Sequence, residues 1–477
     1  MFISTYDAII VGAGPNGLAA AVALAERGLH VKVLEARETI GGGTRTQQLT
    51  LPGFHHDVCS AIHPMALASP FFNTLPLENH GLQWIYPEYP LAHPLDEEPA
   101  VVLYPSLDQT AGELNRDTPA YKKLFGPIIS NFERLIPQLL APFSPFPDTP
   151  ILMARFGWNA VKSARSLAFS RFESHRARAL FAGLAAHSIL PLEQSVSAAI
   201  GLILGAAGHH RGWPLPKGGS HQITNALASH LRALGGEIET DCNVESIDQL
   251  EHARTVFFDL TPAQVLEIAG ESIPPGYARK LQKFRYGAGV FKLDLALDGP
   301  IPWSDSRCLK AGTVHLGGLF EDIADSERAT FKGNHPEKPY VLVAQQSLFD
   351  DTRAPDGKHT AWAYCHVPQG STVDMSEPIL NQIERFAPGF RDRIIGRHSM
   401  NTEQIQRYNA NYIGGDINGG LQDITQLFTR PAGLFNPYHI PETSYYICSS
   451  STPPGGGVHG MCGYHAAMSA LRNHLDT

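Results

Sequence analysis

The glycines near the start of the chain are the residues whose spacing most clearly indicates chemistry. They form a GxGxxG pattern, Gly12-Ala-Gly14-Pro15-Asn16-Gly17. In this pattern the first glycine permits a tight turn, the second lets the backbone approach a pyrophosphate, and the third lets a helix pack closely on a strand. N–H groups at the start of that helix attract phosphate. We therefore expect Gly12, Gly14, Pro15, Asn16 and Gly17 to bind a dinucleotide.

The elements that must position these glycines can be read in the same segment. Tyr6–Val11 is a short apolar run typical of a buried parallel strand, and an alanine-rich helical stretch follows Gly17. A second strand over residues 30–34 ends at Glu35, whose carboxylate can accept hydrogen bonds from both ribose hydroxyls. A lone GxGxxG is weak evidence. Strand, glycines, helix, strand and acid in this order predict a Rossmann-type α/β domain.

A second glycine cluster follows Glu35, and NAD binding does not require one. The segment reads EAR-x3-GG, which resembles the segment after the ribose-binding acid in the FAD-binding amine oxidase and phytoene desaturase superfamily. Many amine oxidases carry Arg directly after the two glycines; this chain has Gly43 there, and we expect Arg45 to substitute in part. The resemblance implies FAD, with contacts from Ala36, Arg37, Gly42, Gly43, Thr44 and Arg45.

The last forty residues predict the other side of the same site. A strand-like run over 445–448 leads into the glycine-rich turn SSSTPPGGGVHG, and a helix is expected from about 462 to 475. A glycine-rich turn that opens a helix is an anion site. We expect Gly457, Val458 and His459 to lie against the pyrimidine edge of the flavin, where negative charge collects on reduction.

Acid or base catalysts are harder to choose, since the chain has 22 histidines. His459, in the turn expected to face the flavin, is the leading candidate for a catalytic role, with a structural or flavin-bonding role as the alternative. Asp416, between two glycine pairs, is the second candidate, although Asp in a tight turn often bonds only its own backbone. His221 follows another glycine pair and is a weaker one. No metal-ligand spacing such as HExxH is present.

Longer stretches of the chain resemble a known family. They include PGFHHDVCSAIHP at 52–64, GWPLPKGGSHQITNAL at 212–227, FRYGAGVFKLDLALDGPIPW at 284–303 and GGDINGG at 414–420. The chain resembles the carotenoid/retinoid oxidoreductase family of phytoene desaturase-like FAD-dependent oxidoreductases. Within it, the pyridine nucleotide-disulfide oxidoreductase domain-containing protein 2 group is the more similar. The matching stretches span nearly the whole chain.

The resemblance implies the architecture. We expect a Rossmann-type FAD-binding domain of the amine oxidase/phytoene desaturase superfamily with an inserted α+β substrate domain. The FAD-binding domain would comprise residues 1–75, 212–265 and 410–477, and the substrate domain residues 76–211 and 266–409. A strand running through Val244 resembles the family segment whose backbone contacts the adenine, so Val244 is a further expected contact.

Composition limits the partners. Of 477 residues, 43% are hydrophobic and 17% charged, and the net charge of −9 argues against nucleic acid. Six singly spaced cysteines predict free thiols in a reducing compartment. The first residues lead into a strand-like run almost at once, so we expect no signal peptide, and no apolar run reaches the roughly 20 residues of a membrane span. We expect a cytoplasmic protein; a peripheral membrane contact stays open, and the oligomeric state is not predicted.

These observations predict an FAD-dependent oxidoreductase that holds FAD non-covalently, since no cysteine lies in an established attachment motif. The expected substrate is an apolar small molecule, such as an isoprenoid or acyl chain, in which a C–C bond is desaturated or isomerised by hydride transfer to flavin. One alternative is a flavin amine oxidase, and another is a non-catalytic binding protein that kept the fold. No second GxGxxG unit is present, so NADPH is not expected as the routine reductant.

Overall fold

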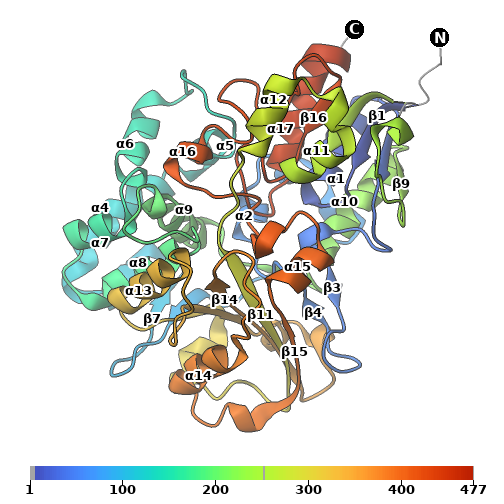
Figure 1. Cartoon of the computed structure of the whole chain (residues 1–477). Coiled ribbons are helices and arrows are strands. Elements are labelled where there is room, and N and C mark those ends of the chain that lie inside the picture. Colours follow the sequence, from blue (N-terminus) through green and yellow to red (C-terminus); the bar gives the residue numbers. More distant parts are fainter. Residues whose placement is uncertain (1–5, 251–252, 476–477) are drawn as a thin grey trace.

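Two β-sheets organise the chain, one in the upper part of Figure 1 and one in the lower part. The computed structural model describes residues 6–250 and 253–475. Its larger sheets have the strand orders β16-β10-β1-β2-β9 and β15-β11-β14-β13-β12-β6-β7. The chain crosses between these sheets several times, so each one is built from segments that are distant in the sequence.

The five-stranded sheet is parallel throughout. Its strands are short apolar runs, as expected for strands buried on both faces. They are β1 (Tyr6–Val11), β2 (Val31–Leu34), β9 (Glu237–Glu239), β10 (Ala253–Phe258) and β16 (Tyr445–Ile447). The predicted strand at 6–11 is confirmed, and β9 ends five residues before Val244.

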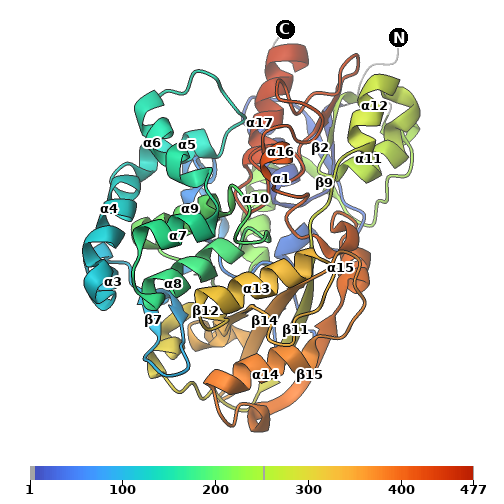
Figure 2. The ribbon, with the colours of Figure 1, turned by 60° about the vertical axis from the view of Figure 1, so that its left-hand side comes forward.

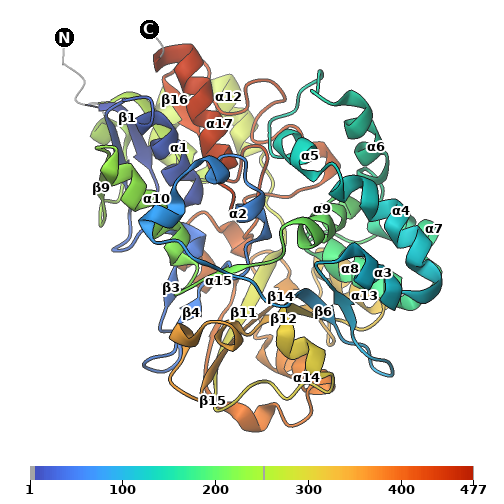
Figure 3. The ribbon, with the colours of Figure 1, turned by 180° about the vertical axis from the view of Figure 1, so that it is seen from behind.

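Helices pack on both faces of this sheet. On one face lie α1 (Pro15–Ala25), α10 (His221–Ala233) and α17 (Met461–Ala470), which Figure 3 shows side by side. The alanines and glycines of α1 are small enough for α17 to approach closely: a Cβ on Gly463 would lie 1.8 Å from the Asn16 carbonyl oxygen. The other face is covered by α11 (Pro262–Ala269) and α12 (Pro275–Gln282).

The seven-stranded sheet has two unlike faces. One is apolar and packs against α14 (Ser376–Phe386), with Phe291, Leu293 and Ile383 in its core. The opposite face carries polar and aromatic side chains and looks toward α8 (His175–Ala186) and α13 (Phe320–Phe331) (Figure 2). Its strands are β6 (Tyr89–His93), β7 (Val101–Leu103), β11 (Gly289–Leu297), β12 (Ala311–Leu316), β13 (Val341–Ala344), β14 (His359–Val367) and β15 (Ile394–Met400).

The remaining helices form a lobe beside the second sheet and a few connections around the first. The lobe contains α3 (Leu107–Glu113), α4 (Thr118–Ile129), α5 (Phe132–Leu139), α6 (Pro150–Ala160), α7 (Ala164–Arg171) and α9 (Ser197–His210). The connections include α2 (Pro64–Ala68), α15 (Thr402–Tyr408), α16 (Ile424–Leu427), the short pair β3 (Thr46–Gln47) and β4 (His56–Asp57), and the pair β5 (Trp84–Ile85) and β8 (Leu215–Pro216).

The predicted fold class is confirmed: an α/β sheet with helices on both faces is joined to a mixed α+β unit. The exact division into 1–75, 212–265 and 410–477 against 76–211 and 266–409 stays a prediction. Within the described residues, no helix is both long enough and apolar enough to span a bilayer. The predicted cytoplasmic location and peripheral membrane contact likewise stay predictions.

Candidate active site

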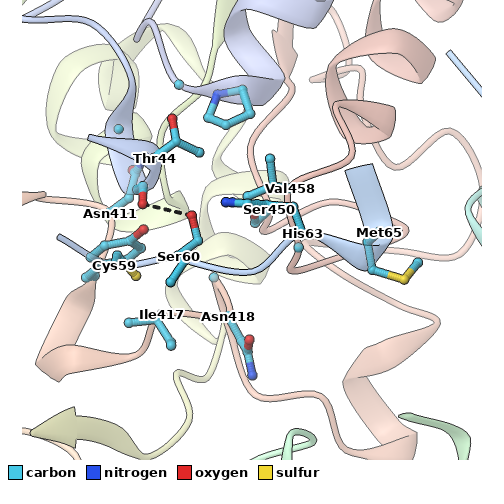
Figure 4. Close-up of a pocket in the computed structure, with 18 of the residues that line it drawn as sticks. Thr44, Cys59, Ser60, His63, Met65, Asn411, Ile417, Asn418, Ser450 and Val458 are labelled. Atoms are coloured by element: carbon cyan, nitrogen blue, oxygen red, sulfur yellow. Dashed lines mark hydrogen bonds between the residues drawn. The ribbon is translucent and has the colours of Figure 1, made fainter. Parts of the chain in front are cut away.

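One cavity reaches from the first turn of α1 to the polar face of the seven-stranded sheet. We call its two parts the glycine end and the sheet end. The glycine end is lined by Gly14, Pro15, Asn16, Gly42, Gly43, Thr44, Gly457 and Val458, with Asp259 beside them. The sheet end is lined by His187, Leu204, Trp213, Thr313, Leu342, Trp362 and Tyr364. Between them lie Cys59, Ser60, His63 and Met65, together with Ile417, Asn418 and Ser450. Figure 4 shows Ile417 and Asn418 below Cys59 and Ser60.

The glycines at the start of α1 are required by close packing. A Cβ on Gly17 would lie 2.1 Å from the carbonyl oxygen of Gly12, which no side chain can tolerate. A Cβ on Gly14 would lie 2.6 Å from Oδ2 of Asp259. Gly12 itself has a φ of +106°, a conformation that glycine adopts without strain. The glycine pattern therefore indicates a turn in which the backbone, rather than side chains, forms the wall of the cavity.

Asp259 was not found from the sequence. It directly follows β10 and its Oδ2 accepts a hydrogen bond of 3.0 Å from the N–H of Gly17. Burial raises the pKa of this carboxyl well above its ordinary value, and the nearby carboxylate of Glu35 adds to the rise. Its position directly after a strand could have indicated this role. The carboxyl ends of parallel strands lie at one edge of a sheet, so an acid that follows β10 lies close to the glycines that follow β1.

Glu35 lies at the end of β2, as predicted, and is 7% exposed. Its Oε2 accepts from the N–H of Ala13 at 3.0 Å, and its Oε1 accepts from the N–H of Arg37 and from Arg45, each at 3.0 Å. A carboxylate has about four acceptor positions. Three are used, so one position on Oε2 remains for a ribose hydroxyl, where the sequence suggested two hydroxyls.

Arg45 points away from the cavity. Besides Glu35 it donates to the carbonyl oxygen of Thr39, at 2.9 Å through Nε, and its guanidinium lies 5.6 Å from the ring centre of Tyr408. It holds the segment after β2 against the strand end. The expectation that Arg45 substitutes in part for the missing arginine at Gly43 stays a prediction.

Several other expected contacts are not part of this cavity lining, and their role in cofactor binding stays a prediction. Ala36 and Arg37 are exposed, and the Arg37 guanidinium donates to the carbonyl oxygen of Arg407. Val244 is buried in the core between the sheet and α11, with Ile9 and Val11. Gly12, Gly17, Glu35, Ala36, Arg37, Arg45, Val244 and His459 are absent from the cavity lining described above.

Neither candidate catalytic residue faces the cavity. His459 is buried; its Nδ1 accepts from the N–H of Met461 at 3.0 Å, and burial lowers its pKa to about 4. The carboxylate of Asp416 accepts from the N–H groups of Gly287, Asn418 and Gly420 at 2.7–3.0 Å. The Asp416 carboxylate and Nδ1 of His459 have structural partners, whereas Nε2 of His459 is buried without a hydrogen-bond partner among the described residues. A catalytic role for either residue stays a prediction. His221 lies at the first residue of α10, outside the lining.

A histidine that sequence reasoning missed does line the cavity. The hydroxyl of Ser220 donates its only proton to the carbonyl oxygen of Ser60 at 2.7 Å. It must therefore accept from Nε2 of His63, 2.8 Å away. This fixes the neutral tautomer with a bare Nδ1, which has no hydrogen-bond partner among the described residues. Burial lowers the pKa of His63 to about 4, so the ring stays neutral at neutral pH.

Aromatic side chains shape the sheet end. The rings of Trp362 and Tyr364 are 4.9 Å apart and nearly perpendicular, at 78°. Behind them Lys292 pairs with Asp294 in a buried ion pair and lines a smaller adjoining cavity. Nothing in the sequence marked Trp362, Tyr364 or His187 as neighbours, because they lie on β14 and at the end of α8. Among the described residues, no cluster of three or more His, Cys, Asp or Glu suited to a metal ion occurs.

Comparisons with known proteins agree with this arrangement. The chain is 23% identical to "Pyridine nucleotide-disulfide oxidoreductase domain-containing protein 2" of Rattus norvegicus, over 98% of this chain and 94% of that protein. It is 23% identical to "4,4'-diapophytoene desaturase (4,4'-diapolycopene-forming)" of Methylomonas sp, over 95% and 93%. The crystal structure of an oxidoreductase from Methanosarcina mazei shares the fold, with a TM-score of 0.66 at 17% identity over 98% of this chain and all of that one.

The family model described as "Flavin containing amine oxidoreductase" matches residues 16–366, well over half of the chain. That span includes α1 from its second residue, Asn16, the whole helical lobe and most of the seven-stranded sheet. The predicted resemblance to phytoene desaturase-like oxidoreductases is confirmed by the desaturases among the relatives. The chain belongs to the flavin containing amine oxidoreductase family and is an FAD-dependent oxidoreductase.

Proposed function

We propose that this enzyme binds FAD non-covalently at the glycine end and desaturates or isomerises a C–C bond of an apolar substrate held at the sheet end. One observation carries the proposal: both ends belong to a single cavity. The glycine end offers backbone surface suited to a dinucleotide, and the sheet end offers mostly apolar and aromatic walls. The desaturase names of several relatives support the same substrate class.

The glycine end fits FAD on observations of this structure. Oδ1 of Asn16 is buried at the cavity wall without a hydrogen-bond partner among the described residues. Glu35 keeps one open acceptor position, and Gly14 brings bare backbone to the surface. Gly43, Thr44, Gly457 and Val458 complete this wall. We propose these residues, together with the main chain around Gly12 and Gly17, as the flavin-binding set.

Cys59 bears on whether the flavin is attached covalently. Its side chain lines the cavity, although no attachment motif surrounds it. Burial raises the pKa of the thiol, which lowers the fraction of the nucleophilic thiolate. We therefore propose that FAD is held without a covalent bond.

When bound, FAD supplies the hydride acceptor for the oxidation. The chain supplies a dry, apolar wall through Leu204, Trp213 and Leu342, which excludes water from the reacting bond. His63 presents the bare Nδ1 to the cavity and can take up the proton that leaves with the hydride. Among the described residues the cavity lining contains one other histidine, His187, and its neutral tautomer is a donor at the cavity, as shown below.

The amine oxidase alternative has less support at the sheet end. An ammonium group binds well over the face of an aromatic ring, and two parallel rings form an effective cage. Trp362 and Tyr364 stand nearly perpendicular, so they do not form two parallel walls.

The test is anaerobic reduction of the purified yellow protein, followed by loss of flavin absorbance at its long-wavelength band. Apolar isoprenoids and acyl compounds should bleach the flavin, and primary amines of the same chain length should not. Bleaching by amines alone would overturn the proposed substrate class. Acid precipitation should release FAD, and flavin that stays with the polypeptide would contradict non-covalent binding.

NADH and NADPH serve as controls in the same apparatus. The chain carries a single GxGxxG unit between strand and helix, so neither nucleotide should bleach the flavin at useful rates. Rapid bleaching by either one would show that the chain accepts hydride from a nicotinamide instead.

A further inference from the structure

The polar face of the seven-stranded sheet forms the floor of the sheet end. In the strand register Leu342 pairs with both His315 and Tyr364, on either side of it. Successive residues of a strand point to opposite faces. Thr313 and His315 on β12, Leu342 on β13, and Trp362 and Tyr364 on β14 therefore share one face. Because neighbouring strands lie about 4.8 Å apart, this floor is roughly 10 Å wide from β12 to β14.

His187 stands over this floor at the end of α8 and contacts it through one nitrogen. Its Nε2 lies 3.0 Å from Nε2 of His315. One of these two nitrogens must carry the proton of this hydrogen bond. If His315 carries it, Nδ1 of His187 is protonated and is a donor at the cavity; if His187 carries it, Nδ1 of His187 is an acceptor.

The surroundings of His315 determine which of the two nitrogens carries the proton. Its Nδ1 is buried without a partner among the described residues. A buried N–H that makes no hydrogen bond is rarer and costlier than a bare ring nitrogen, so His315 carries its proton on Nε2. His315 then donates to Nε2 of His187, and the neutral His187 ring must carry its own proton on Nδ1. Burial lowers the pKa of both rings, that of His187 to about 3, so both stay neutral.

The Nδ1–H of His187 is thus a donor at the cavity wall, with no hydrogen-bond partner among the described residues. A second such donor lies on the floor: the indole N–H of Trp362 is buried without a partner there, in a side chain that is 7% exposed. The hydroxyl of Tyr364 is a third, and it has no hydrogen-bond partner among the described residues either. The sheet end therefore offers unsatisfied donors and needs a ligand with an acceptor.

The charged residues on the cavity lining indicate whether the ligand itself is charged or neutral. Asp259 is the one carboxyl group on the described cavity lining, and it lies at the glycine end bonded to Gly17. No Lys or Arg is on the described lining of this cavity either. The nearby Lys292 lines the adjoining cavity, and its ammonium group is paired with Asp294. A charged group would be buried there without an opposite charge, which is far costlier than burying a neutral one.

We propose that His187, oriented by His315, anchors an uncharged carbonyl oxygen of an otherwise apolar substrate at the sheet end. This inference rests on the proposed function and names the substrate class of the same site. The apolar body of the substrate lies along Leu204, Trp213 and Leu342, and its carbonyl oxygen accepts from Nδ1–H of His187. His315 is a positioning residue, because it acts on the substrate only through the tautomer of His187.

The test uses the FAD-loaded enzyme and four probes of equal length: decyl methyl ketone, dodecane, dodecylamine and dodecanoate. Binding is followed by the perturbation of the flavin absorption spectrum, so no turnover is needed. The ketone should bind about five- to tenfold more tightly than the hydrocarbon, as expected for one neutral hydrogen bond. Tighter binding of the amine or of the carboxylate than of the ketone would overturn the proposal.

Variants then assign the effect to His187. His187→Phe should keep the bound flavin and the affinity for dodecane, while the advantage of the ketone disappears. His187→Gln, which keeps an amide donor, should retain most of that advantage. His175→Phe is the matched control, since His175 lies at the other end of α8 with a half-exposed side chain paired to Glu98. An advantage that survives in His187→Phe would overturn the proposal.

His315 is tested by rescue. His315→Phe should reduce the ketone advantage, because His187 is then free to place its proton on either nitrogen. His315→Gln should restore it, because the glutamine amide can donate from near the position of the histidine Nε2. Equal effects of the two variants would show that His315 serves packing alone. An enzyme that cannot be loaded with FAD at all would instead count against the proposed function, so the two failures are distinguishable.

Discussion

The glycine end and the sheet end of the cavity are built in opposite ways. At the glycine end the wall is main chain, and the structure requires side chains to be missing: a Cβ on Gly17 or Gly14 would lie within 2.6 Å of another atom. At the sheet end the wall is made of side chains from three strands, from the end of α8, and from α9 and the segment after it. A backbone site depends on a short local pattern, whereas a side-chain site depends on which strands pair and in which register.

The two ends also differ in charge. The glycine end carries the carboxyl of Asp259, and the buried ion pair of Glu35 and Arg45, at 3.0 Å, lies outside the cavity lining next to the first turn of α1. The sheet end holds neutral groups, because burial lowers the pKa of His187 and His315. Cofactor binding should therefore respond to charge, and substrate binding to hydrogen-bond donors. Changes at the glycine end are expected to alter flavin content, while changes at the sheet end leave it unchanged.

The largest effect is expected from Gly17→Ala. The new methyl group would lie 2.1 Å from the carbonyl oxygen of Gly12, so the turn before α1 must open. We expect loss of bound flavin and destabilisation of about 4 kcal/mol or more, at the upper end for single substitutions. Flavin content by absorbance and urea unfolding measure the two effects.

Gly157→Ala is the matched control for that change. Gly157 lies inside α6, and a Cβ there meets nothing within 4 Å. Alanine in a helix interior should stabilise the protein by about 0.5–1 kcal/mol, with flavin content unchanged. Equal flavin loss in both variants would remove the contrast between the two ends.

A smaller effect is expected from Glu35→Gln. The glutamine amide group must face either the N–H of Ala13 or the N–H groups of Arg37 and Arg45, so two donors oppose each other. The dissociation constant of FAD should rise about tenfold or more, because charge-assisted hydrogen bonds are lost. Titration of the apoprotein with fluorescent FAD measures it. Glu38→Gln, at an exposed neighbour, should change nothing; a similar constant in both variants would show that Glu35 does not bind the cofactor.

The smallest effect is expected from Asp259→Asn, and it depends on pH. Burial raises the pKa of Asp259 in the folded protein, so its stabilising contribution is present below the ordinary value near 3.9 and is lost as pH rises toward the folded-state value. The asparagine can still accept from Gly17. The melting temperature of the variant apoprotein should equal that of the wild type near pH 4 and exceed it at pH 7. A constant difference across this range would contradict the raised pKa.

The sequence was informative where a function depends on neighbours along the chain. The GxGxxG pattern, the second glycine cluster and Glu35 lie within the first 45 residues, and the structure places Gly14, Pro15, Asn16, Gly42, Gly43 and Thr44 on one wall. The pattern predicted the strands and helix around them because hydrophobic period and glycine spacing are local. Residue type and local pattern were less informative for His459 and Asp416. Their residue types suit catalysis, but in the structure their side chains accept hydrogen bonds from backbone N–H groups.

The cofactor class, the fold class and the glycine wall of the cavity could thus be predicted from local patterns in the chain. Which histidines face the cavity could not be predicted in this way, because His63 and His187 owe their tautomers to Ser220 and His315, more than 120 residues away along the chain. The tertiary structure also decided that Trp362 and Tyr364 form the floor. Such contacts follow from strand register and from the packing of α8 over the sheet, and no local pattern encodes either one.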